Sequence, residues 1–107
     1  MPVEDRRILF SNEELYKALY AFCFQKQVRQ PPPGVITKVS EDAQDKSKVL
    51  FILENPQDQT GTTLEYSHDF LAAALMLYCR SCGIPLPKSG RKSVLIQGAE
   101  VMLRVQI

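Results

Sequence analysis

The chain has 107 residues, a hydrophobic share of 45%, a charged share of 23% and a formal net charge of +1. This length and composition predict a single globular domain, and the balanced charge argues against a dedicated high-affinity nucleic-acid binder. No apolar run approaches the roughly 20 residues of a membrane span, and the N-terminal segment lacks the pattern of a secretory signal. We therefore expect a cytoplasmic protein whose three cysteines are reduced thiols.

An internal repeat organises the chain. Residues 10–34 and 66–90 align without a gap at a shift of 56 positions, which predicts one structural unit that occurs twice. We call residues 8–54 copy 1 and residues 64–107 copy 2, and we expect a polar linker at 55–63 within a single domain of residues 1–107. The identical pairs are Ser11/Ser67, Leu15/Leu71, Ala18/Ala74, Leu19/Leu75, Cys23/Cys79, Pro31/Pro87 and Gly34/Gly90.

Each copy is expected to begin with a helix. Ser11 and Ser67 have the sequence context of N-cap residues, and Glu14 completes a capping box in copy 1. Apolar residues at helical spacing follow each cap and predict one buried stripe per helix. Gly83 is expected to end the second helix in a left-handed conformation, whereas the three prolines at 31–33 are expected to end the first.

Two strands are expected after each helix. They are residues 35–40 and 48–53 in copy 1, and residues 92–97 and 100–107 in copy 2, where Gly98 and Ala99 form a two-residue turn. Residues 8–10 and 64–66 are expected to add short extended pieces. The predicted fold is α+β: a tandem α-β-β repeat that forms one four-stranded, mainly antiparallel sheet in two layers, with both helices on one face and a pseudo-twofold axis.

The open face of this expected sheet is the first candidate site. If Val35 and Val39 face the helices, strand alternation places other apolar residues on the uncovered face. The alternatives are cover by the N-terminal segment, residues 3–9, or contact with a partner protein or a second copy in a homodimer. The face residues are Ile36, Leu50, Ile52, Leu95 and Met102.

A second candidate is a group of cations in and around the sequence PKSGRKS. The spacing and the helix–loop–strand order do not fit a phosphate-binding P-loop, and a solvated loop is the ordinary interpretation. The alternative is contact with an anion or, less favoured, with nucleic acid. The residues are Arg80, Lys88, Arg91, Lys92 and Arg104.

The cysteines and the single histidine offer little chemistry. Cys79 and Cys82 form a CxxC motif in the last turn of a helix, where the helix dipole opposes thiolate formation. Cys79 aligns with Cys23, which has no neighbouring cysteine, so a core role is favoured over a redox pair. His68 lies at the other end of that helix, so we expect no metal site, no cofactor and no catalytic residue.

The segment IPLPKSGRKSV in copy 2 resembles part of a group of small, uncharacterised bacterial proteins that share an IPLP-x-x-x-RKSV pattern. The resemblance covers the last quarter to third of the chain. It implies a bacterial, cytosolic setting and brings no activity or site residues with it.

Three functional hypotheses follow, none of them enzymatic. The favoured one is a small protein-interaction or self-associating module that acts through the sheet face or the helix ends. The alternatives are a weak anion-binding or nucleic-acid-binding module that uses the basic residues around 88–92, and a redox-sensitive regulator that uses Cys79 and Cys82. Function is expected where the two copies differ, because the residues they share are those that fold the unit.

Overall fold

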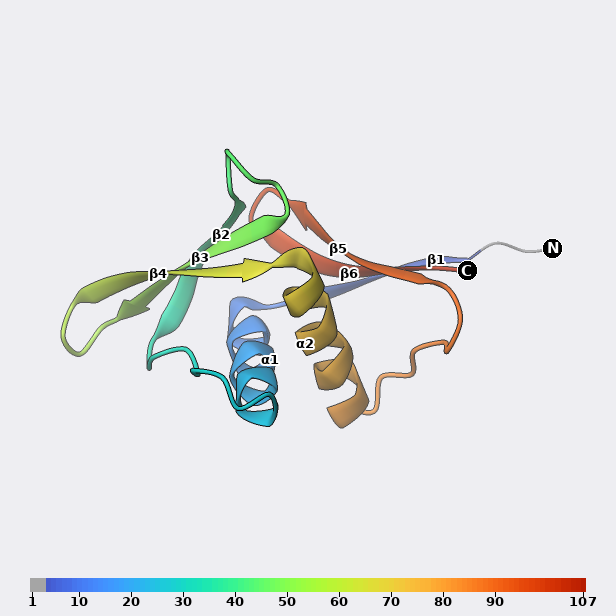
Figure 1. Cartoon of the computed structure of the whole chain (residues 1–107), viewed down its shortest axis with the longest axis horizontal. Helices are drawn as coiled ribbons and strands as arrows, with labels where there is room; N and C mark the ends of the chain where they lie inside the picture. Colours follow the sequence, from blue (N-terminus) through green and yellow to red (C-terminus); the bar gives the residue numbers. More distant parts are fainter. Residues whose placement is uncertain (1–3) are drawn as a thin grey trace.

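A computed structural model of the chain describes residues 4–107. Two helices lie side by side beneath two sheets that spread along the long axis of the molecule (Figure 1). Neither helix in this part of the chain is long and apolar enough to cross a membrane. In chain order the elements are β1 (Asp5–Phe10), α1 (Asn12–Gln25), β2 (Val35–Glu41), β3 (Lys48–Asn55), β4 (Thr60–Ser67), α2 (His68–Ser81), β5 (Arg91–Gln97) and β6 (Glu100–Gln106).

The strands form two antiparallel sheets of three strands each, with orders β1-β6-β5 and β2-β3-β4. The predicted single sheet of four strands is therefore wrong, although the α+β class and the two helices are confirmed. The short extended pieces expected at 8–10 and 64–66 belong to two full strands, and residues 60–63 of the expected linker are part of β4.

Each copy gives its first strand to the sheet of the other copy. β1 of copy 1 pairs with β6 of copy 2, with Phe10 opposite Val101, and β4 of copy 2 pairs with β3 of copy 1, with Tyr66 opposite Val49. The exchange is reciprocal, as expected for two related units that share one core. It was missed because the β1–β6 partners lie about 90 to 100 residues apart, beyond the reach of local sequence patterns.

The helix starts follow the sequence. The Ser11 hydroxyl accepts from the Glu14 amide at 3.1 Å, and the Ser11 amide donates to the Glu14 carboxylate at 2.9 Å, so the capping box is confirmed. In copy 2 the Ser67 hydroxyl accepts from the Phe70 amide at 3.0 Å. Each cap satisfies amides that the first helical turn leaves without an intrahelical partner.

Both helices end through the same left-handed turn, which corrects one prediction. Gly83 has a φ of +73°, and the Ile84 amide donates to the Cys79 carbonyl at 2.8 Å. In copy 1 it is Gln27, at φ +58°, that adopts this conformation, and Val28 donates to Cys23 at 3.0 Å. The prolines at 31–33 therefore follow a helix that has already ended.

A bulge in β2 decides which residues of that strand face the helices. The register shifts between Ile36 and Lys38, and Thr37 is the extra residue. Ile36 and Val39 consequently face the core together, at 2% and 4% exposure, while Val35 is 56% exposed. The expectation that Ile36 points away from the helices is wrong, because it assumed strict alternation.

One hydrophobic core joins both copies beneath the two sheets. It combines the helix stripes with the inward residues of the central strands, among them Phe51 of β3 and Leu103 of β6, both fully buried. Complete burial of one such side chain stabilises the fold by roughly 1.5–3 kcal/mol. The expected pairing of Gln97 with Glu100 is confirmed, and it directs Val94, Val101 and Leu103 into this core.

Candidate anion-binding pocket

The structure brings three of the five predicted cations to one cavity. Arg80 on the last turn of α2, Lys88 in the loop that follows, and Lys92 on β5 line a pocket of about 460 Å³. Three different segments of copy 2 therefore supply the charges. The remaining lining residues are apolar: Met76, Leu86 and Pro87.

The local fold explains why these side chains converge. Strand alternation directs Lys92 toward the helix side of β5, on the same face as the core residue Val94. Arg80 is exposed on α2. The left-handed turn at Gly83 reverses the chain, so the loop that carries Lys88 returns beside the helix before β5 begins.

The pocket is basic and contains no acidic lining residue. Within residues 4–107, none of its three cations takes part in an ion pair. Cations gathered around a concave, partly apolar site repel one another unless an anion joins them, and the confined space strengthens their attraction for it. The arrangement suits a ligand whose phosphate or carboxylate group contacts the cations and whose apolar part lies against Met76 and Leu86.

The other two predicted cations lie elsewhere. Arg91 precedes Lys92 on β5 and points to the opposite face of the sheet. Arg104 of β6 donates to both carboxylate oxygens of Asp5, at 3.1 and 2.8 Å. This hydrogen-bonded pair lowers the pKa of Asp5 and raises the pKa of Arg104, so the guanidinium stays charged and its charge is balanced by the Asp5 carboxylate.

The predicted sheet face is less open than expected. Of its five residues, Ile36 lies in the core and Met102 is only 5% exposed, while Leu50, Ile52 and Leu95 are partly buried. Leu9 of β1, which is not one of these five residues, is 54% exposed and stands opposite Met102. Residues 5–10 pair at the edge of the sheet and do not cross its face; Val3 lies outside the described residues.

The two cysteines of the CxxC motif differ in burial. Cys79 is fully buried and Cys82 is exposed. Burial raises the pKa of Cys79, and the nearby Cys82 adds to that effect, so the buried thiol resists ionisation. Burial also raises the pKa of Cys23, its counterpart in copy 1. A redox role for Cys79 and Cys82 stays a prediction.

His68 belongs to a surface pair at the start of α2. Its Nε2 lies 3.7 Å from a carboxylate oxygen of Glu41 and has no hydrogen-bond partner within the described residues. In the same part of the chain, no three His, Cys, Asp or Glu side chains gather closely enough to hold a metal ion.

Comparison of the chain with protein-family models, with curated proteins and with solved structures finds no match.

Proposed function

We propose that the protein is a binding module that holds a phosphorylated small molecule in the pocket between α2, the loop after it, and β5. The observation that carries the proposal is the convergence of Arg80, Lys88 and Lys92 on one cavity without an acidic residue in its lining. Phosphate groups are recognised by Arg and Lys through charge-assisted hydrogen bonds.

The shape of the pocket favours a small ligand over a nucleic-acid strand. The apolar lining of Met76, Leu86 and Pro87 offers contact area to a compact organic group. A nucleic-acid backbone needs a longer basic path, and Arg91 and Arg104 lie on the other face of the sheet. No aromatic residue lines the pocket, which disfavours base stacking.

The test is to titrate the protein with inorganic phosphate and with phenyl phosphate and to monitor binding by the NMR chemical shifts of the backbone amides. We expect saturable shifts at residues 80, 88 and 92, with tighter binding of phenyl phosphate because its ring packs on the apolar lining. Lys92→Gln and Arg80→Gln should each weaken binding by roughly tenfold to a hundredfold, since a hydrogen bond to a charged group contributes about 1.5–3 kcal/mol.

Arg91→Gln is the matched control, because it removes the same charge from the neighbouring position on the opposite face of β5. Phosphate binding should survive this change. Absence of saturable shifts, or equal loss in the control, would contradict the proposal. Tight binding of a DNA duplex that depends equally on Arg91 and Lys92 would identify a nucleic-acid interface instead.

A further inference from the structure

The four edge strands of the two sheets are not equally protected against pairing with another chain. β1 carries Arg6 and Arg7, β5 carries Arg91 and Lys92, and β2 carries Lys38 beside its bulge. Basic residues and bulges are the usual devices that keep edge strands from pairing with other chains. β4, with the sequence TGTTLEYS, has no Lys, Arg, Pro or bulge along its eight residues, and its one charged side chain, Glu65, is paired with Lys48 of β3 at 2.7 Å.

β4 also keeps one row of backbone groups available. It pairs only with β3, so every second residue directs its amide and carbonyl away from the sheet. Outside the strand ladder, no hydrogen bond within residues 4–107 involves the backbone of residues 61–66. Five edge residues, 62–66, correspond to about 17 Å of extended chain.

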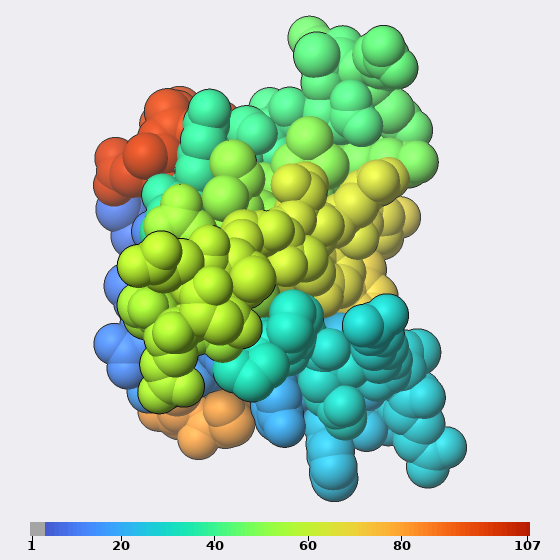
Figure 2. Space-filling view, turned by 90° about the vertical axis from the view of Figure 1, so that its left-hand side faces the viewer, coloured from blue at the N-terminus to red at the C-terminus, as the bar shows by residue number. Residues whose placement is uncertain are grey.

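A slot runs beside this edge. Its volume is about 300 Å³, and its walls are residues 62–66 on one side and residues 29–32 on the other. Both the inward-facing Leu64 and the outward-facing Glu65 line it, so the slot follows the strand edge and not one face of the sheet. Figure 2 shows β4 crossing this side of the molecule with the segment after α1 directly beneath it.

In the other sheet, a side chain bridges the equivalent edge strand to its neighbouring loop. The edge strand there is β1, and the Arg6 guanidinium donates a hydrogen bond to the carbonyl of Pro85 at 3.2 Å. The shift of 56 positions aligns Arg6 of β1 with Thr62 of β4, and Arg29 with Pro85. The short threonine cannot make this bridge. The two copies therefore differ in whether a side chain ties the loop to the edge strand.

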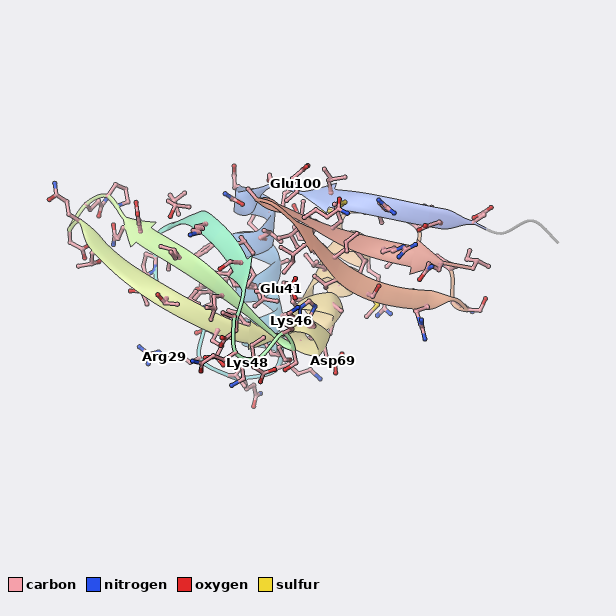
Figure 3. All side chains as sticks on the ribbon, turned by 90° about the horizontal axis from the view of Figure 1, so that it is seen from above. Arg29, Glu41, Lys46, Lys48, Asp69 and Glu100 are labelled. Carbon is pink, nitrogen blue, oxygen red and sulfur yellow. The ribbon has the colours of Figure 1, made fainter. Side chains whose placement is uncertain are left out.

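We propose that an extended segment of a partner protein docks in this slot and adds a strand to β4. Backbone hydrogen bonds to residues 62–66 supply affinity, and alternate side chains of the segment enter the slot. The apolar surface of Leu64, Tyr66 and Pro32 favours apolar residues at those positions. Arg29, on the β4 side of the molecule (Figure 3) and in no ion pair within residues 4–107, favours an acidic residue at one end.

The test is selection of a phage-displayed library of random seven-residue peptides on the folded protein. We expect enriched sequences with apolar residues at alternate positions. The most enriched peptide, synthesised with blocked ends, should bind and should slow hydrogen exchange of amides within residues 61–66. Thr62→Arg should weaken this binding at least tenfold, because the new guanidinium can reach the loop and close the slot. Arg6 makes the equivalent bridge from β1 to Pro85.

Thr37→Arg is the matched control, because it adds the same side chain to an exposed threonine of β2, at the opposite edge of the same sheet and outside the slot. This variant should keep the peptide. Failure to enrich any sequence, or a peptide that binds Thr62→Arg as well as the original protein, would overturn the proposal. A dimer of the protein that Thr62→Arg dissociates would replace the partner segment by a second copy of this chain. The basic pocket is separate, so neither result depends on phosphate binding.

Discussion

The two copies share one scaffold and differ at the same place on it. In copy 2 the region between the helix, its following loop and the first strand of the hairpin holds Arg80, Lys88 and Lys92 around a pocket. At the aligned positions copy 1 has Phe24, Pro32 and Ile36. Each of the three cations of copy 2 thus aligns with an uncharged residue of copy 1, and the last of these, Ile36, is part of the core.

The second difference is at the edge strands, and here copy 1 has the open site. Beside β1, which pairs with copy 2, Arg6 bridges the edge strand to the loop, whereas beside β4, which pairs with copy 1, the corresponding slot is open. One half of the molecule thus offers a basic pocket and the other offers a strand edge. The two copies share the residues that cap and pack their helices and differ on the surfaces between the elements.

The largest effect is expected from exchanging the aligned residues Ile36 and Lys92. Ile36→Lys should destabilise the protein by about 4 kcal/mol or more, because it places a charge at a site of 2% exposure and removes a core side chain. Lys92→Ile should change stability by less than about 1 kcal/mol, since Lys92 is only partly buried. Urea unfolding followed by circular dichroism measures both. Equal effects would show that the two positions are not distinct environments.

A smaller effect is expected at the glycines that both copies share. A Cβ at Gly90 would lie 2.7 Å from the Gln106 carbonyl oxygen, and one at Gly34 would lie 2.9 Å from that of Glu54. Gly90→Ala and Gly34→Ala should each cost roughly 1–3 kcal/mol, because neither backbone carbonyl can move without disturbing its strand. Gly61→Ala is the control, as nothing lies within 4 Å of its added Cβ. If either substitution lowered the free energy of unfolding no more than Gly61→Ala does, the two glycines would not have equivalent roles.

The smallest effect concerns the left-handed residues that end the helices. Gln27→Gly should stabilise the protein by roughly 0.5–1 kcal/mol, because glycine adopts the φ of +58° without steric cost. Gly83→Ala should destabilise it by about 1 kcal/mol for the opposite reason, since open space surrounds its Cβ position and only the backbone conformation resists. Thermal unfolding of the two variants gives the sign directly, and shifts of the same sign would refute this account of the helix ends.

The sequence predicted the parts of the fold that local chemistry decides. Ser11 and Ser67 cap their helices, Gly83 ends α2, and the Gly98 turn sets the register of β5 and β6, all as expected. The basic residues of copy 2 were also recognised, although only three of the five share a pocket. The slot beside β4 was not predicted, since its two walls are separated by about 30 positions in the chain.

Caps, stripes and turns could be read from the sequence because each depends on contacts within a few residues. The division into two sheets could not, because it depends on the pairing of β1 with β6, about 90 to 100 residues away, even though β4 pairs locally with the preceding strand β3. The bulge at Thr37 shifts the register of β2 and places Ile36 in the core instead of on the expected surface. What the tertiary structure decided is therefore which surfaces face solvent, and with them the pocket and the open edge.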